Sequence, residues 1–191
     1  MEINNLHKYI YVLDDAIPLR VNETFLRFCK DLNYEKAGIV KDKNKNKVEE
    51  HIRKTLSYSL VPHFKSMTIT HWKNYLHHSF SKLVQMYRRQ FNIDDNFEVN
   101  DIQILKYVNE GHYNFHTDDS RFIHRRVSCI YLINDDYEGG NLVFRAPDSD
   151  KKTVIETKKN RMIIWPSNFL YPHSVETVTK GERYSVVAWA L

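Results

Sequence analysis

The sequence predicts an α+β protein in which helices from the N-terminal half support a double-sheet jelly roll built by the C-terminal half. Two observations carry this prediction. Before residue 98, apolar and aromatic residues recur at helical spacing. After residue 98, the sequence consists of short runs rich in β-branched and aromatic residues, which are typical of strands. Many short strands at regular spacing are typical of a sandwich or a jelly roll. With 191 residues, the chain is expected to form a single domain, 1–191, with a helix-rich supporting half at 1–98 and a strand-rich half at 99–191.

Two helices are expected in the N-terminal half. Asn22 is placed to cap the first, in which Phe25, Phe28, Cys29 and Leu32 recur at helical spacing. The second is expected to begin at Thr70, and its apolar stripe comprises Trp72, Leu76, Phe80, Leu83, Val84, Tyr87 and Phe91. We interpret both stripes as core faces that pack against a sheet.

The segment KDKNKNK, residues 41–47, lies between the two helices. Its composition indicates a solvated loop. Contact with nucleic acid and a role as a mobile lid beside an active site are the alternatives, and the lid would extend over residues 35–66.

Six strands are expected after residue 98, separated by turns rich in Asn, Asp and Gly. They are the runs VNDIQILKYV, RRVSCIYLIN, NLVF, KTVIE, RMIIWP and RYSVVAWAL.

Composition excludes several classes of protein. The formal net charge of +4 is a mild excess, far from the basic balance of a dedicated nucleic-acid binder. Cys29 and Cys129 both lie among apolar neighbours and are expected to be buried thiols in a reducing compartment. The N-terminus lacks the pattern of a secretory signal, and no apolar run approaches membrane-spanning length, so a cytoplasmic protein that does not associate with membranes is expected.

Two histidines and one aspartate form the most informative pattern in the chain. His116 and Asp118 are separated by one residue and can share a face at the end of a strand. His173 follows 57 residues after His116. Two imidazoles and one carboxylate are the ligand set of non-haem Fe(II) sites that leave coordination positions open. Arg183 lies ten residues beyond His173, where a fixed cation could hold the far carboxylate of a cosubstrate.

Five segments extend this pattern in a fixed order: ILKYVNEGHYNFHTDD, CIYLINDDYEGGNLVF, NRMIIWPSN, LYPHSVETV and GERYSVVAW. Together they resemble the C-terminal half of a 2-oxoglutarate- and Fe(II)-dependent oxygenase of the prolyl 4-hydroxylase type. The resemblance covers residues 99–191 and implies a double-stranded β-helix core in that catalytic half. It also implies Fe(II), 2-oxoglutarate and O2, with ascorbate as an expected reductant.

The resemblance assigns roles to individual residues. It makes His116, Asp118 and His173 the iron ligands and makes Arg183 the partner of the cosubstrate's distal carboxylate. Tyr107 matches a tyrosine that helps to hold 2-oxoglutarate, and Trp189 matches a tryptophan of the peptide pocket, although packing alone would explain an aromatic residue at both positions. Arg125 resembles a substrate-side arginine, with Arg126 as the alternative.

The chain departs from this family at one point. Many relatives read Tyr-Leu-Asn where this sequence has residues 132–134, Leu-Ile-Asn, and some place a cosubstrate-binding tyrosine at the first of these positions. Tyr131 is one residue away and would face the opposite side of a strand, so we predict that Tyr107 rather than Tyr131 contacts the cosubstrate.

The expected substrate is a proline-containing peptide or protein, which would be hydroxylated with release of succinate and CO2. The alternatives are an oxygenase of a free amino acid or other small molecule, a nucleic-acid demethylase, and a cupin-like binding domain with a degenerate metal site. Demethylases of that type usually carry a second arginine six residues past the cosubstrate arginine, where this chain has Trp189. A bacterial, viral or cytosolic enzyme is expected, and the oligomeric state is left open.

Overall fold

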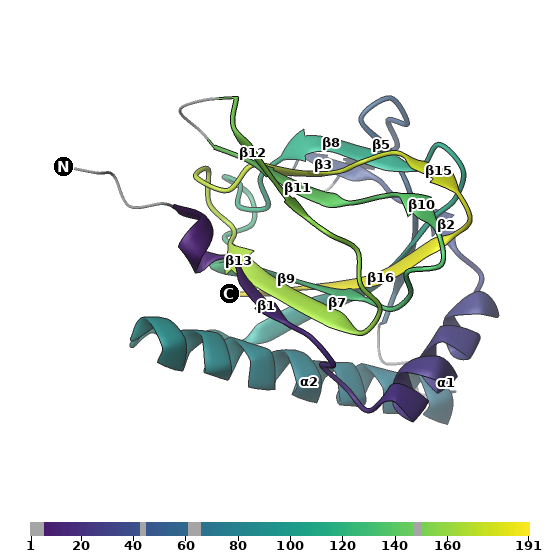
Figure 1. Cartoon of the computed structure of the whole chain (residues 1–191), viewed down its shortest axis with the longest axis horizontal. Coiled ribbons are helices and arrows are strands. Elements are labelled where there is room, and N and C mark those ends of the chain that lie inside the picture. The colour runs from purple at the N-terminus through teal and green to yellow at the C-terminus, as the bar shows by residue number, and fades with distance from the viewer. Residues whose placement is uncertain (1–5, 43–44, 61–65, 147–149) are drawn as a thin grey trace.

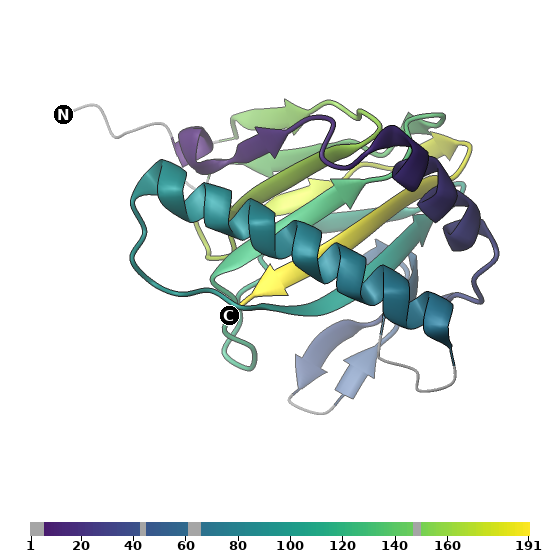
Figure 2. The ribbon, with the colours of Figure 1, turned by 90° about the horizontal axis from the view of Figure 1, so that it is seen from below.

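Two antiparallel β-sheets face each other, and two helices cover the outer face of the larger sheet (Figure 1). This arrangement comes from a computed structural model that describes residues 6–42, 45–60, 66–146 and 150–191. Figure 2 shows α2 (Met67–Phe91) running across the strands of the larger sheet, with α1 (Leu19–Lys30) beside it. Neither described helix combines the length and hydrophobicity that a membrane span requires.

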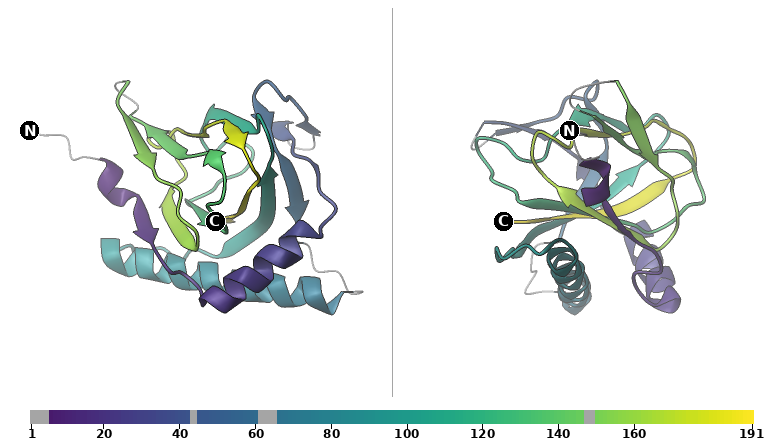
Figure 3. Two further views of the ribbon diagram at one scale, coloured as in Figure 1. Left: turned by 45° about the vertical axis from the view of Figure 1, so that its right-hand side comes forward. Right: turned by 60° about the vertical axis from the view of Figure 1, so that its left-hand side comes forward.

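The larger sheet has the strand order β1-β13-β9-β16-β7-β6-β2 and the smaller sheet the order β12-β11-β14-β8-β5. Beyond α2, the chain crosses repeatedly between the two sheets, although β11 and β12 are consecutive strands of the smaller one, and the two sheets wrap around a common interior in Figure 3. This alternation is the double-stranded β-helix expected from the sequence. The elements not yet bounded are η1 (Leu6–Tyr9), β1 (Tyr11–Leu13), β2 (Glu35–Lys36), β3 (Ile39–Asp42), β4 (Lys45–Lys47), β5 (Arg53–Lys54), β6 (Leu56–Ser59), β7 (Val99–Tyr107), β8 (His112–His116), β9 (Val127–Leu132), β10 (Glu138–Gly139), β11 (Leu142–Arg145), β12 (Lys152–Ile155), β13 (Arg161–Pro166), β14 (His173–Val175), β15 (Val178–Lys180) and β16 (Arg183–Ala190).

The apolar stripe predicted for α2 is the face that packs on the larger sheet. Its buried members are Trp72, Leu76, Phe80, Leu83, Val84 and Tyr87. The predicted start at Thr70 is wrong. Ser66 caps the helix and accepts a hydrogen bond from the amide of Ile69, while the Thr70 hydroxyl donates back to the Ser66 carbonyl. Serine and threonine are both favoured at helix N-caps, but Ser66 has the extended backbone that a cap requires, whereas Thr70 lies within the helix.

The first helix also begins earlier than predicted, at Leu19 after Pro18. Asn22 does not cap it. The Asn22 side chain is buried within the helix and donates a hydrogen bond to the carbonyl of Ile133, beside β9. An asparagine that suits a cap in the sequence therefore joins the helix to the sheet, which a local pattern does not reveal.

The N-terminal half contributes strands as well as helices, so describing it as helix-rich is incomplete. β1, β2 and β6 extend the larger sheet, and β5 extends the smaller one. The solvated loop expected at 41–47 is also wrong in part, because β3 and β4 pair as an antiparallel hairpin, with residues 43–44 outside the described part of the chain. These strands have two to four residues, too few for a clear period in the sequence.

Side chains alternate between the helix-covered face and the interior along each strand of the larger sheet. On β16, Tyr184, Val186, Ala188 and Ala190 join the core beneath the helices. The residues between them, Arg183, Ser185, Val187 and Trp189, face the interior that the two sheets enclose. This alternation positions the functional site.

Candidate metal centre and adjoining cavity

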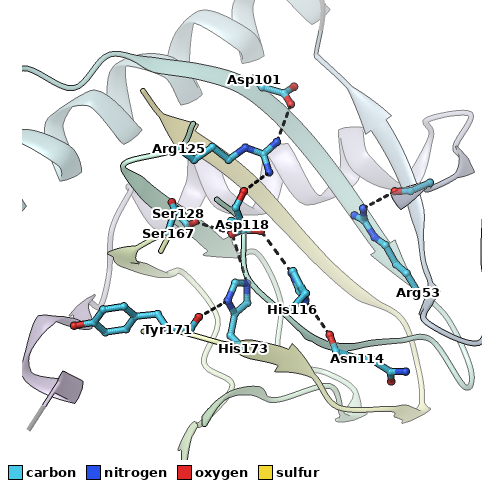
Figure 4. Close-up of polar contacts among 11 residues, drawn as sticks. Arg53, Asp101, Asn114, His116, Asp118, Arg125, Ser128, Ser167, Tyr171 and His173 are labelled. Atoms are coloured by element: carbon cyan, nitrogen blue, oxygen red, sulfur yellow. Dashed lines mark hydrogen bonds and ion pairs between the residues drawn. The ribbon is translucent and has the colours of Figure 1, made fainter. Parts of the chain in front are cut away.

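His116, Asp118 and His173 converge at the mouth of the interior, and one ligand atom from each lies within 4.8 Å of the others (Figure 4). His116 is the last residue of β8, Asp118 follows two residues later, and His173 begins β14. The two histidines are register partners across the β8–β14 pair. Nε2 of His116 lies 3.5 Å from Oδ1 of Asp118, and Nε2 of His173 lies 3.5 Å from Oδ2.

A β-bulge aims His116 at this centre. Between two register pairs, β8 advances from Tyr113 to His116 while β14 moves only from Val175 to His173, so β8 carries one extra residue. Tyr113 and His116 consequently share the inner face, and their rings stack with centroids 3.6 Å apart at 17°.

Backbone carbonyls orient both imidazoles. Nδ1 of His116 is hydrogen-bonded to the carbonyl of Asn114 at 2.9 Å, and Nδ1 of His173 to that of Tyr171 at 3.1 Å. A carbonyl only accepts, so each Nδ1 carries a proton and Nε2 is the ring nitrogen that each histidine turns to the centre. Burial lowers the pKa of His173 to about 4, so this ring is neutral at pH 7.

The third ligand is held in its ionised form. Burial raises the pKa of Asp118, but the two imidazoles and a hydrogen bond from Ser128 outweigh that effect, and the pKa lies well below its usual range. Ser128 Oγ donates to Asp118 Oδ2 at 2.7 Å. Since this uses its one proton, the 2.7 Å contact with Ser167 makes Ser167 the donor to Ser128. Two imidazoles and one ionised carboxylate are a suitable donor set for Fe(II).

A cavity of about 610 Å³ adjoins the three ligands between the sheets. Tyr107, Arg125 and Trp189, all predicted from the sequence, line it together with the three ligands. Its other lining residues include Ala37, Gly38, Ile39, Arg53, Asp101, Gln103, Leu105, Tyr113, Ile123, Leu142, Trp165 and Val187. The β2–β3 segment, which was not predicted to form strands, therefore contributes part of the wall.

Arg183 is fully buried at the start of β16, and its register partner is Tyr107 on β7. Its guanidinium carbon lies 4.9 Å from the centroid of the Tyr107 ring, and Nη1 donates to Ser185 Oγ at 2.8 Å. Nε and Nη2 are buried without a hydrogen-bond partner. Gly140 makes room for this side chain, because a Cβ there would lie 2.9 Å from Arg183 Cδ.

The two unpartnered donors of Arg183 fit a carboxylate. Buried hydrogen-bond donors are almost always satisfied, and a guanidinium can present two parallel N–H groups to one carboxylate. The indole Nε1 of Trp165, on the cavity wall, is a further buried donor without a partner. Arg183 is not itself a lining residue, but it contacts the ring of Tyr107, which is one, so these donors suit an oxygen-rich anion such as 2-oxoglutarate at that end of the cavity.

Arg125, rather than Arg126, is the arginine that reaches the cavity. Its guanidinium lies 3.6 Å from the centroid of the Trp189 ring and 3.8 Å from a carboxylate oxygen of Asp101. Its Nη1 also donates to the Asp118 carbonyl at 3.4 Å. The side chain of Arg126 is 63% exposed and does not line the cavity.

Tyr131 lies away from the cavity, as the register of its strand predicted. Its buried hydroxyl is hydrogen-bonded to the side-chain oxygens of Asn22 and Asn160 on the helix-covered face. Leu132 faces the interior instead and packs with Leu142.

Sequence reasoning missed Arg53, Tyr113, Ser128 and Ser167. Ser128 carried a usable signal, because it is a polar residue on the inward face of a strand whose other residues are mostly apolar. Tyr113 is concealed by the bulge, which breaks the two-residue period, and Arg53 lies on a two-residue strand.

Comparison with known proteins shows which family part of the chain resembles. Residues 102–191 match the model of the 2OG-Fe(II) oxygenase superfamily. A 66-residue segment is 41% identical to human prolyl 3-hydroxylase 2, covering 34% of this chain but only 9% of that protein. A 95-residue segment is 33% identical to a PKHD-type hydroxylase of Prochlorococcus marinus, covering 48% of this chain and 41% of that protein. These matches therefore span less than half of either relative.

Solved structures resemble the chain over nearly its whole length. A prolyl-4-hydroxylase of Pseudomonas putida superposes with a TM-score of 0.71 at 18% identity, covering 94% of this chain and 91% of that one. A prolyl hydroxylase of Trichoplax adhaerens, solved with a hypoxia inducible factor peptide fragment, gives 0.72 at 15% identity, covering 95% and 83%. The chain thus matches the 2OG-Fe(II) oxygenase superfamily in sequence over residues 102–191 and resembles its prolyl 4-hydroxylase type in fold.

Proposed function

We propose that this protein is an Fe(II)- and 2-oxoglutarate-dependent dioxygenase that hydroxylates proline in a peptide. The observation that carries the proposal is the convergence of His116, Asp118 and His173 beside a cavity, with the unpartnered donors of Arg183 behind it. Bound Fe(II) would supply the redox chemistry in which one atom of O2 enters succinate and the other enters the substrate as a hydroxyl.

The protein's own contribution is positioning. The three ligands would hold the metal through Nε2, Nε2 and the Asp118 carboxylate. The Nδ1 hydrogen bonds and the Ser128 hydroxyl keep these atoms aimed at the centre before the metal arrives.

Arg183 and Tyr107 would hold the distal carboxylate of 2-oxoglutarate. The burial of Arg183 excludes water from this contact, so the charge-assisted hydrogen bonds are stronger than they would be in solvent.

Trp189 and Arg125 are proposed to bind the substrate. Their stacked side chains form a rigid surface beside the ligands, suited to the ring of a proline and the carbonyls next to it. The prolyl hydroxylases among the relatives and solved structures support the peptide assignment. Those relatives include both 3- and 4-hydroxylases in name, and we propose hydroxylation at carbon 4.

A second candidate is an oxygenase of a free amino acid or another small molecule. The volume of about 610 Å³ favours it, because it falls within the range typical of small-ligand pockets. Nucleic-acid demethylation is disfavoured, since the position of the second arginine in those enzymes is Trp189, which stacks on Arg125.

The test incubates the protein with Fe(II), 2-oxoglutarate, ascorbate and a library of proline-containing peptides, with free amino acids in a parallel arm. We expect succinate release and a mass gain of one oxygen on a peptide, and product analysis then assigns the carbon. Succinate release with hydroxylation of free amino acids alone would select the second candidate. His116→Ala is the control, with its fold checked by circular dichroism.

A further inference from the structure

Arg53, on β5, is a second arginine of the cavity wall that has no assigned role. Its guanidinium carbon lies 4.7 Å from the centroid of the Tyr113 ring, which stacks at 3.6 Å on His116. The guanidinium carbon is therefore at most 8.3 Å from the ring centre of the His116 imidazole, the sum of these two separations. Figure 4 shows Arg53 on the His116 side of the three ligands.

The hydrogen-bonding capacity of Arg53 is only partly used. Nη1 donates to the carbonyl of Gly38 at 3.1 Å, whereas Nε is buried without a hydrogen-bond partner. Across residues 6–42, 45–60, 66–146 and 150–191, no carboxylate forms an ion pair with this guanidinium. A buried donor without an acceptor is costly, so an acceptor is expected from outside the chain.

Arg125 differs from Arg53 in this respect, although both line the same cavity. Arg125 has Asp101 as an ionic partner and donates to the Asp118 carbonyl. The cavity therefore carries one guanidinium with a carboxylate partner and one without.

We propose that Arg53 binds a carboxylate of the substrate, an inference that rests on the proposed function of the site. In a peptide, this would be an acidic side chain one or two residues from the hydroxylated residue, because an extended chain advances about 3.3 Å per residue. In a free amino acid, the α-carboxylate would take the same place. The shared chemistry is a carboxylate held by a guanidinium that stacks on Tyr113.

The experiment measures binding, so that it does not depend on turnover. Protein loaded with Mn²⁺ and 2-oxoglutarate without O2 is titrated with fluorescent proline-containing peptides that carry Asp, Asn or Lys at the neighbouring positions. Free amino acids and their amides form a second arm, read by calorimetry. The variants are Arg53→Gln and Arg53→Glu, with Arg126→Gln as the matched change of an exposed arginine outside the cavity.

We expect the wild type and Arg126→Gln to prefer the carboxylate-bearing ligand by about tenfold or more over its neutral counterpart. Arg53→Gln should lose this preference, and Arg53→Glu should prefer the Lys peptide. Selectivity in the peptide arm alone identifies an acidic side chain, and selectivity in the amino-acid arm alone identifies an α-carboxylate.

Two outcomes would overturn the proposal. One is a wild type that binds charged and neutral ligands equally. The other is Arg53→Gln weakening both equally, which would assign Arg53 to holding the Gly38 segment in place. Failure of the proposed function would register separately, as a lack of Fe(II)-dependent succinate release.

Discussion

Replacing Arg183 with methionine should stabilise the protein in the absence of cosubstrate while abolishing its response to 2-oxoglutarate. Methionine fills a similar elongated space without bringing polar atoms into the core. The reason for the expected gain is that Arg183 is fully buried and that two of its nitrogens have no hydrogen-bond partner.

The magnitude follows from the contacts of Arg183. Relieving two unsatisfied buried donors is worth about 2–6 kcal/mol in total. Against this, the variant loses the hydrogen bond to Ser185, about 0.5–1.5 kcal/mol, and the cation–π contact with Tyr107, about 0.5–2 kcal/mol. At the midpoints of these ranges, a gain of about 4 kcal/mol exceeds a loss of about 2 kcal/mol, so the variant is favoured by about 2 kcal/mol, which corresponds to roughly 4–8 °C in Tm for a chain of this size.

The assay is thermal unfolding of both proteins with Mn²⁺, with and without 2-oxoglutarate. At 100 times its Kd, the cosubstrate should stabilise the wild type by about 2.7 kcal/mol, and the same concentration should leave Arg183→Met unchanged. Arg126→Met, which replaces an exposed arginine, should change neither the Tm without cosubstrate nor the stabilisation by 2-oxoglutarate. A variant with a lower Tm than the wild type, or one that keeps the 2-oxoglutarate response, would refute the reasoning.

Three further predictions address the metal centre, the core and the surface. Ser128→Ala removes the donor to Asp118 Oδ2 and should weaken Mn²⁺ binding about 10- to 100-fold by calorimetry; an unchanged affinity would count against the role of this hydroxyl. Tyr131→Phe leaves the buried Asn22 oxygen without its donor and should cost about 1–3 kcal/mol in urea unfolding, yet leave 2-oxoglutarate binding intact. Hydrogen bonds from Arg161 and Lys158 hold the pKa of Asp14 well below its usual range. The ionised carboxylate therefore stabilises the folded protein above pH 4, and this stabilisation disappears as the pH falls towards the lowered pKa. Asp14→Asn should therefore be less stable than the wild type by up to about 1 kcal/mol at pH 7, and the difference should shrink below pH 4; a constant difference would contradict this.

Six of the ten strands described after residue 98 match the runs expected from the sequence, because their side chains follow a two-residue period, whereas the short strands β8, β10, β14 and β15 lie outside those runs. That period places Arg183 and Trp189, six residues apart, on the same inward face of β16, and it places Tyr131 on the opposite face of β9. The ligand set was also accessible, since His116 ends one strand and His173 begins another.

The remaining features depend on tertiary contacts or on a broken period. A bulge turns Tyr113 to the same face as His116, so alternation assigns it to the wrong side. Arg125 and Arg126 precede β9, where no period applies, and tertiary contacts such as that of Arg125 with Trp189 distinguish them. Arg53 reaches the site because β5 pairs with β8, where Arg53 is the register partner of Tyr113. A strand of two residues has too short a pattern for this distant pairing to be predicted from the sequence.

The most direct test of the central claim is succinate release from 2-oxoglutarate under O2, measured with and without Fe(II) in the wild type and in His116→Ala. If His116, Asp118 and His173 hold the catalytic iron, release will require Fe(II) in the wild type and will be lost in the variant, whose circular dichroism spectrum remains that of the wild type. Succinate release that persists without Fe(II), or that is unchanged in His116→Ala, would contradict the assignment of the metal centre.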